Sequence, residues 1–423
     1  MISIERARTN SYLLTTATTT ATKTQSSFSV ISVANNEELL IEILLRLPIK
    51  SLLKFKSVSK YWLSLISCSH FSYLHKDHNP FPNSASGLFL RRHSPLVNPQ
   101  FSFVDLNLNP DTCSSASFRS LTFIDNPSGV NILQSCNGLL LCSSFPGANQ
   151  SKTNYYIYNP TTKQYSLLPP FGSSNGALRT VFAVSLAFDP FKSPYYKVVC
   201  VRDSGSSGNH FQFEIYSSDT GLWRVCGSSL SAFSNVQFYG GVYWHGSVHW
   251  ISTLGNSLYF NIDKEEVQEL PMPPIPDFSL KRVFNYFEES RDHLHLIEIY
   301  DFQNLEFNVY EIERDYSGWF VKYHVDLGAV PIAFPEMKTT TSSDLHCYRF
   351  SILSVVRGQR DENSYLVLSI PGKVVRYNFQ DKTFHKLCDI PTGHDGIDDF
   401  DGWSSFSVSS SDAYQYTESL SYV

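Results

Sequence analysis

The chain carries the stretch E-E-L-L-I-E-I-L-L-R-L-P-I-K-S-L-L-K-F-K-S-V-S-K-Y-W-L-S-L-I-S at residues 37–67. From Leu40 onward, apolar residues recur at i, i+3, i+4 and i+7, which is the spacing of one face of an amphipathic helix. Pro48 ends this helix, because proline has no N–H and pushes the preceding residue out of the helical region. Two more short helices follow, the second with Trp62 on its apolar face. The stretch predicts a three-helix unit of residues 36–78.

A unit of about 40 residues is close to the lower limit for independent folding, so it usually needs a partner surface. The segments I-L-x-R-L-P, K-S-L-L-x-F and V-S-K-x-W occur in this order between Glu37 and His75, and they resemble the F-box motif of plant F-box proteins. This resemblance implies docking on a Skp-type adaptor, which links F-box proteins to a cullin in an SCF ubiquitin ligase. The adaptor-binding residues that it implies are Leu39, Leu40, Ile43, Leu44, Leu47, Pro48, Leu52, Val58 and Trp62.

The same segment leaves alternatives open. Where the family usually begins with Leu-Pro, this chain has Asn35 and Asn36, so one apolar adaptor contact worth about 1–2 kcal/mol is expected to be missing. The leucines are also consistent with a purely internal core. A helix pair that reads DNA is a further alternative, suggested by the basic residues of this segment. Acidic residues lie beside them, however, so a solvent-exposed charged face explains the basic residues equally well. The basic residues concerned are Arg46, Lys50, Lys54, Lys56 and Lys60.

The rest of the chain is a repeated β region, separated from the helices by a Pro- and Asn-containing linker at residues 79–86. Motifs of the type Y-I-Y-N recur 44 to 67 residues apart, each among about four strand-like runs. This is the pattern of β-propeller blades. Residues 137–390 hold five units, and residues 87–125 are expected to complete a sixth with the C-terminal aromatic residues Trp403, Phe406, Tyr414 and Tyr416.

We therefore predict a multidomain α and β chain. Its small three-helix unit is followed, at residues 87–423, by an all-β propeller of about six four-stranded blades. Four motifs resemble the F-box-associated, kelch-like region of plant F-box proteins, which implies a surface that binds a target protein. They are S-C-N-G-L-L-L at 135–141, Y-N-P-T-T-K at 158–163, F-D-P at 188–190 and Y-T-E-S-L at 416–420.

Composition limits the function classes. The 423 residues are 42% hydrophobic and 17% charged with a net charge of −6, which argues against bulk disorder and against a chain built to coat nucleic acid. The eight cysteines form no C-x-x-C pair, and no apolar run reaches 18 residues. We expect an intracellular protein of the cytoplasm, the nucleus or both, without a membrane partner. The Ser/Thr-rich residues 1–34 are expected to be a disordered leader, with a transit peptide as the alternative.

No catalytic residue, metal site or cofactor is predicted. The histidine pairs of Y-W-H-G-S-V-H-W and H-L-H-L are interpreted as structural or surface residues, because no Cys or carboxylate recurs at ligand spacing. The acidic cluster Asp395, Asp398, Asp399 and Asp401 is interpreted as a solvated loop, with glycoside hydrolysis as its alternative. Loops of a rigid scaffold carry recognition. The loop residues expected to face a target are Arg202, His210, Arg291 and Arg357.

The leading hypothesis is a non-catalytic substrate receptor of an SCF-type ubiquitin ligase. The helical unit would bind the Skp-type adaptor, and the propeller would present an unknown protein substrate. One alternative is a propeller hydrolase acting on a sugar or another small molecule. The other is an F-box scaffold that does not lead to degradation, which shares every residue with the leading hypothesis.

Overall fold

The computed structural model divides into two compact units, Met1–Pro80 and Phe81–Val423, and each is described by itself. The structure describes residues 36–79, 85–92, 100–107, 114–115, 117–119, 121, 123–124, 129–144, 153–171, 180–204, 210–231, 236–253, 255–275, 282–300, 305–340, 346–390 and 412–423. The leader at 1–34, most of the linker, and the C-terminal aromatics Trp403 and Phe406 lie outside these residues.

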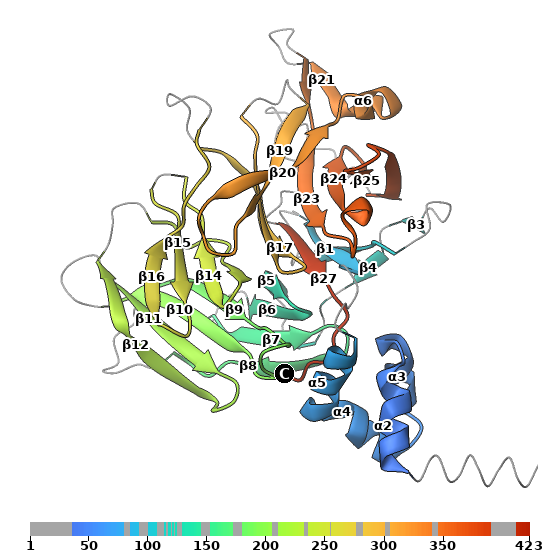
Figure 1. Cartoon of the computed structure of the whole chain (residues 1–423), viewed down its shortest axis with the longest axis vertical. Coiled ribbons are helices and arrows are strands. Elements are labelled where there is room, and N and C mark those ends of the chain that lie inside the picture. The colour runs from blue at the N-terminus through green and yellow to red at the C-terminus, as the bar shows by residue number, and fades with distance from the viewer. Residues whose placement is uncertain are drawn as a thin grey trace, which may run out of the picture. The chain divides into compact units, whose positions relative to one another are not determined.

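Residues 36–79 form four helices, shown in blue in Figure 1. Three helices were predicted, and the fourth was not distinguished from the third. Cys68 takes an extended backbone (φ −79°, ψ 147°) that ends one helix, and its sulfur accepts a hydrogen bond of 3.3 Å from the Phe71 N–H that begins the next. The helices are α2 Glu37–Leu45, α3 Ile49–Phe55, α4 Lys60–Ser67 and α5 Ser69–His78.

Local caps set the start of two of these helices. The Asn36 side chain accepts a hydrogen bond of 3.2 Å from the Leu39 N–H, and the Ser59 hydroxyl accepts one of 3.1 Å from the Trp62 N–H. Such caps satisfy N–H groups that have no partner within the helix. Pro48 separates α2 from α3 as predicted. The order of helices in this unit is thus largely written in the local sequence.

The second unit is a six-bladed propeller, as predicted. Its described residues form a two-stranded hairpin and six blade sheets, each with four antiparallel strands that run outward from an innermost strand, and one of the six has a fifth, parallel strand at its edge. Blade 1 contains β5 Val130–Cys136, β6 Leu139–Ser144, β7 Tyr155–Asn159 and β8 Gln164–Leu167. Blade 2 contains β9 Val181–Ala187, β10 Lys197–Asp203, β11 His210–Ser217 and β12 Leu222–Ser231. Blade 3 contains β13 Val242–Trp244, β14 Ser247–Trp250, β15 Leu258–Asn261 and β16 Glu266–Glu269.

The second half of the ring follows the same pattern. Blade 4 contains β17 Phe284–Ser290, β18 His293–Glu298, β19 Glu306–Ile312 and β20 Trp319–Asp326. Blade 5 contains β23 Ser351–Val356, β24 Tyr365–Ile370, β25 Lys373–Asn378 and β26 Phe384–Asp389. Blade 6 contains β27 Ala413–Tyr416, β1 Gly87–Arg92, β2 Gln100–Asp105 and β4 Ser117–Arg119.

Blade 6 closes the ring by joining the two ends of this unit. Its innermost strand is β27, which pairs antiparallel with β1 from Leu90↔Ala413 to Gly87↔Tyr416. Figure 1 shows the red β27 beside the blue β1. The innermost strands contact one another in the order β5, β9, β13, β17, β23 and β27, and β27 returns to β5. The predicted pairing of the first strands with Tyr414 and Tyr416 is therefore confirmed.

A few elements depart from the simple repeat. The short strand β3, Ser114–Ser115, comes from the β2–β4 connection but pairs in parallel with β26 at the edge of blade 5. Between blades 4 and 5 the chain forms α6 Val330–Ala333, the 3₁₀ turn η1 Pro335–Met337, and the hairpin of β21 Lys338–Thr340 with β22 His346–Tyr348. A second 3₁₀ turn, η2 Asp361–Asn363, lies between β23 and β24. Single-sequence periodicity does not indicate these additions.

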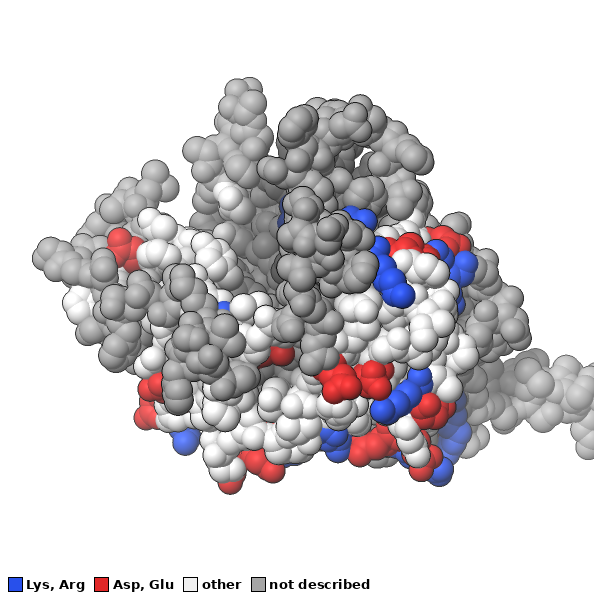
Figure 2. All heavy atoms as spheres, turned by 90° about the horizontal axis from the view of Figure 1, so that it is seen from above, with Lys and Arg blue, Asp and Glu red and all other residues white. Residues whose placement is uncertain are grey.

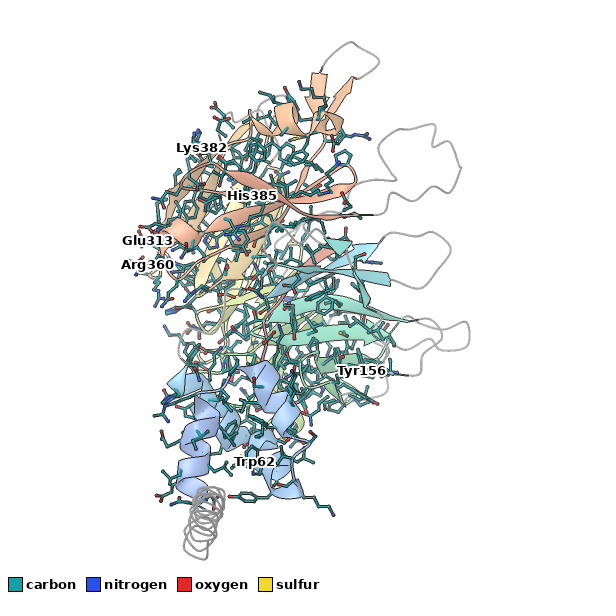
Figure 3. All side chains as sticks on the ribbon, turned by 90° about the vertical axis from the view of Figure 1, so that its right-hand side faces the viewer. Trp62, Tyr156, Glu313, Arg360, Lys382 and His385 are labelled. Atoms are coloured by element: carbon teal, nitrogen blue, oxygen red, sulfur yellow. The ribbon has the colours of Figure 1, made fainter. Side chains whose placement is uncertain are left out.

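In each of blades 1 to 5 the first-to-second and third-to-fourth strand connections lie at the same end, because the strands alternate in direction. We call this end of the propeller the turn face. Glu313, Arg360 and Lys382, from three such connections, lie along one side of the molecule in Figure 3. The tightest of these turns place His245 (φ 47°) and Arg291 (φ 51°) in the left-handed region, as two-residue hairpins require.

Candidate functional site

Helix α2 presents two apolar stripes rather than one. Leu40 and Leu44 are 2% and 0% exposed and pack inward, as does Leu45. Leu39 and Ile43 are 48% and 46% exposed, and they lie one turn apart on a different side of the same helix. An amphipathic helix of a monomer normally keeps its outer side polar, so the second stripe indicates a surface for another molecule.

Helix α5 holds the end of α2 in place. The Asn79 side-chain amide donates hydrogen bonds of 2.8 Å to the carbonyls of Leu45 and His75. The His75 Nε2 hydrogen-bonds the Leu47 carbonyl at 2.9 Å, and burial lowers the pKa of His75. Carbonyls at a helix C-terminus need partners of this kind. The helical unit therefore supports its exposed stripe from behind.

Helix α4 adds further apolar side chains to the exposed surface of the unit. Desolvation and, next, the nearby Glu37 carboxylate raise the pKa of the Tyr61 hydroxyl, so the starts of α4 and α2 lie close together. Trp62 is half-buried and meets Phe55 edge-on at 5.5 Å between ring centroids. Five apolar side chains of the unit, which we call the exposed apolar set, are at least 45% exposed: Leu39, Ile43, Val58, Tyr61 and Leu63.

The structure divides the nine residues that were predicted to bind the adaptor. Leu40, Leu44 and Leu52 are buried in the helical unit and support its surface. Leu47 and Trp62 are half-buried. Leu39, Ile43, Pro48 and Val58 are exposed and remain accessible to a partner. Tyr61 and Leu63 are equally exposed but are not among the residues that the resemblance implied.

Of the four residues expected to face a target, the structure brings Arg291 and Arg357 close together and leaves Arg202 and His210 apart from them. Arg202 lies within β10, is 5% exposed, and pairs with the buried Glu214. Arg357 directly follows β23 and is 7% exposed. Arg202 is therefore a strand residue and not the loop residue that was expected, whereas Arg357 lies in the β23–β24 connection, as expected, although its side chain is buried. His210 begins β11, away from the turn face, whereas Arg291 lies in a turn on that face.

Arg357 anchors the blade 5 connection instead of displaying its charge. Its guanidinium forms an ion pair of 2.9 Å with Asp361 and hydrogen-bonds the Tyr323 hydroxyl. Its backbone N–H donates a hydrogen bond of 3.1 Å to the Ser290 hydroxyl in blade 4. Burial, with a smaller contribution from the charge of Arg357, lowers the pKa of the neighbouring Arg291. This arginine pair is thus largely part of the blade 4–blade 5 contact.

The two histidines of H-L-H-L, on β18, both face the buried carboxylate of Glu311, on β19. His293 Nδ1 lies 2.8 Å from Glu311 Oε1, and His295 Nε2 lies 3.4 Å from Glu311 Oε2. Burial raises the pKa of Glu311, but the hydrogen bond from His293 and the proximity of both imidazoles outweigh it and lower the pKa overall. Among the described residues, no group of three His, Cys, Asp or Glu side chains is arranged to hold a metal ion.

His249 is part of the blade 3 core. It is fully buried, with Nδ1 3.2 Å from the Val242 carbonyl and Nε2 2.8 Å from the Tyr316 hydroxyl. Burial lowers the pKa of His249 to about 3. The partner in Y-W-H-G-S-V-H-W, His245, lies in the adjoining turn. The two histidines therefore occupy different environments.

The buried His249 predicts a pH dependence of stability. The unfolded chain binds a proton at this histidine below about pH 6.5, whereas the folded chain does so only near pH 3. The free energy of unfolding should therefore be unaffected by this group above pH 6.5, and decrease by about 1.4 kcal/mol per pH unit between the two values. Urea unfolding at pH 7, 6 and 5 measures this slope.

A His249→Gln variant should lose the contribution of one proton to that slope, which is about 1.4 kcal/mol per pH unit. His385, exposed on β26 and labelled in Figure 3, provides the matched control, and His385→Gln should leave the slope unchanged. An equal slope in the wild-type chain and the His249→Gln variant would contradict the assignment.

Other features considered from the sequence have simple outcomes. Asp395, Asp398, Asp399 and Asp401 lie outside the described residues. Acidic and basic side chains are interspersed over the described part of the face seen in Figure 2. None of the helices in the described part of the chain is long and apolar enough to cross a membrane.

Comparison with known proteins gives the same division of the chain. Residues 36–72 match the family described as F-box domain, and residues 96–281 match the F-box associated beta propeller domain. F-box protein At5g07610 of Arabidopsis thaliana is 41% identical over 384 residues, which cover 86% of this chain and 88% of that protein. F-box protein At5g49610 of the same plant is 28% identical over 324 residues, covering 72% and 83%.

The helical unit and the six-bladed propeller correspond to the two matched families in order, and the propeller match covers residues 96–281 of this second unit. The identity to a full-length plant F-box protein extends over both parts. The chain belongs to the F-box protein family and combines an F-box domain with an F-box-associated β-propeller.

Proposed function

We propose that this F-box protein is the substrate-recognition subunit of an SCF-type ubiquitin ligase in the cytoplasm, the nucleus or both. The helical unit docks on a Skp-type adaptor, which connects it to a cullin, and the propeller binds the target protein. The chain itself supplies no catalytic group. Its contribution to the rate is to hold a target lysine close to a ubiquitin carrier, which raises the effective concentration.

The observation that supports docking most directly is the exposed apolar set. Leu39 and Ile43 remain about half exposed on a helix whose other apolar stripe is fully buried. Because full burial of such a side chain contributes about 1.5–3 kcal/mol, covering the exposed half of each one in an interface contributes about 1 kcal/mol. This stripe and Pro48 therefore form the first part of the proposed adaptor contact, with Val58 and Trp62 in the later part.

The test is a Leu39→Asp plus Ile43→Asp variant of the full chain. We expect its affinity for a purified Skp-type adaptor to fall by about 3 kcal/mol or more, which is at least 100-fold, because two apolar contacts are replaced by desolvated charges. Isothermal titration calorimetry measures the loss, and far-UV circular dichroism verifies that the helices persist. Leu44 is unsuitable for this purpose, since it is 0% exposed and a charge there would unfold the unit.

The control is a Ser64→Asp plus His70→Asp variant, which adds the same residue type at exposed polar positions of α4 and α5. It should bind like the wild-type chain. Wild-type binding that the Leu39 and Ile43 changes leave intact would refute the assigned face, and a folded wild-type chain that binds no Skp-type adaptor would refute the function. Ubiquitination of captured partners by the reconstituted complex then separates a degradative receptor from a scaffold.

A further inference from the structure

A pocket of about 580 Å³ lies where blade 3 meets blade 4. This volume is within the range of about 300–1,000 Å³ that is typical of ligand pockets. The strands of blade 3 are short, with three or four residues each. The β19–β20 turn of blade 4 lies over blade 3, where its Tyr316 ring stacks on the Tyr259 ring. The residues that line the pocket include Tyr259, Glu269, Leu270, Met272, Arg282 and Tyr316.

One wall of the pocket is a rigid aromatic stack. The rings of Tyr259 and Tyr316 are parallel within 6° with centroids 4.2 Å apart. The Tyr316 hydroxyl is held by His249 at 2.8 Å, and the Tyr259 hydroxyl hydrogen-bonds Gln268. Because these hydroxyls are already engaged, the stack offers a ring surface rather than a hydrogen-bonding group. Ring faces of tyrosine attract cations, and arginine in particular stacks on them.

The charge in the pocket favours a cation. Arg282 donates to the Glu298 carboxylate and to the Pro273 carbonyl, so its positive charge is matched within the protein. Glu269 is exposed at the end of β16, and no ion pair joins it to another residue in the described part of the chain. Glu269 and Arg282 are the charged residues of the described lining, and together with the Glu298 partner of Arg282 they carry one net negative charge. Leu270 and Met272 supply apolar surface for the stem of a long side chain.

We propose that this pocket binds an arginine or lysine side chain from an extended segment of the target protein. The charged group lies against the tyrosine stack and beside Glu269, and its methylene stem packs on Leu270 and Met272. This inference rests on the proposed target-binding role of the propeller. It assigns the partner chemistry to a site between blades, whereas the loop arginines suggested by the sequence would favour an acidic partner.

Methionine provides a specific probe of this pocket. The chain has three methionines, of which Met272 lines the pocket and Met337 is fully buried between blades 4 and 5. We would label the full chain with [methyl-¹³C]methionine, assign Met272 with a Met272→Leu variant, and titrate with the peptide acetyl-Gly-Arg-Gly-amide. We expect a saturable shift of the Met272 resonance and no shift of Met337. Acetyl-Gly-Leu-Gly-amide and acetyl-Gly-Glu-Gly-amide should bind at least fivefold more weakly than the arginine peptide.

A charge variant tests the electrostatic part. Glu269→Gln should weaken binding of the arginine peptide at least threefold while keeping the pocket shape. Glu266→Gln, on the same strand but outside the pocket, should leave it unchanged. Raising the salt concentration from 0.1 to 0.5 M should weaken binding of the arginine peptide more than binding of the leucine peptide. Equal binding of the arginine and leucine peptides, an unaffected Glu269→Gln variant, or a silent Met272 would each overturn the proposal.

The two proposals can fail separately. The peptide titration involves no adaptor, so loss of adaptor binding would remove the ligase function and leave the pocket result standing. Conversely, a target captured on the propeller with an unchanged Met272 resonance would remove only the pocket assignment.

Discussion

A chain that ends at residue 412 is expected to lack a cooperatively folded propeller. The truncation removes β27, the innermost strand of blade 6, which contacts both β5 and β23. Tyr416 is 9% exposed and meets Phe89 and Phe103 edge-on at 5.7 and 5.6 Å. Burial of this ring, of Tyr414 and of Leu420 contributes about 2 kcal/mol each, so the total rivals the usual net stability of about 5–15 kcal/mol.

Hydrogen bonds across the ring strengthen the same expectation. The Gln415 amide donates to the Ser354 hydroxyl of blade 5 at 2.9 Å, and the Ser135 hydroxyl of blade 1 donates to the Gln415 carbonyl at 2.5 Å. One strand therefore ties both neighbouring blades together. Without it the inner edge of β1 has no partner, and an open ring keeps two unpaired blade faces.

Urea unfolding followed by near-UV circular dichroism measures the effect. The control ends at residue 416, retains β27, and loses only the last seven residues. In the full chain, the Asn159 amide donates hydrogen bonds to the Ser419 and Ser421 carbonyls at 3.1 and 2.7 Å. This shorter truncation should lower stability by about 2–3 kcal/mol and keep a cooperative transition. A chain ending at residue 412 that unfolds cooperatively near the wild-type midpoint would contradict the closure.

An Arg202→Met variant is expected to lose about 3–5 kcal/mol of stability. Arg202 and Glu214 form an ion pair between β10 and β11, with side chains 6% and 1% exposed. Their strand positions are diagonal, because Arg202 is opposite Gln212 while Glu214 is opposite Cys200. Removing the arginine leaves a carboxylate enclosed in blade 2 without a compensating charge, which is one of the most costly single changes in a folded protein.

The matched double variant separates pairing from packing. Arg202→Met with Glu214→Leu removes both charges, so its stability should return to within about 1 kcal/mol of the wild-type chain. Arg224 pairs with Glu265 at 2.5 Å and its side chain is 60% exposed, so Arg224→Met should cost less than about 1 kcal/mol. Guanidinium unfolding is avoided because of its ionic strength, and urea is used instead. A stable single variant with altered target binding would instead support the contact role predicted from the sequence.

Much of the fold was predictable because it depends on neighbours in the chain. The caps at Asn36 and Ser59 and the break at Pro48 act within four residues, and they are visible as residue types at short spacing. The repeated strand pairs with intervening turns predicted six blades for the same reason. The helix α5 was missed because its start is a cysteine cap, which the usual capping residues do not indicate.

The candidate site was less predictable. Periodicity groups Leu40, Ile43 and Leu44 on one helical face, but the structure buries the first and last of these and exposes Ile43. Neighbouring helices make this choice, since α5 covers one side of α2. Arg202 and Arg357 likewise resemble surface residues in a linear sequence, and only their partners across strands show that they are internal.

The sequence alone determined the F-box segment, the repeated β region and the number of blades, because short-range spacing and turn chemistry encode them. Tertiary structure decided which apolar stripe faces outward, which charges are enclosed, and where blades 3 and 4 leave a pocket. It also decided the bond that joins Ser135 to Gln415, two residues 280 positions apart. Such contacts depend on how whole blades pack, and no local pattern records which distant residues will meet.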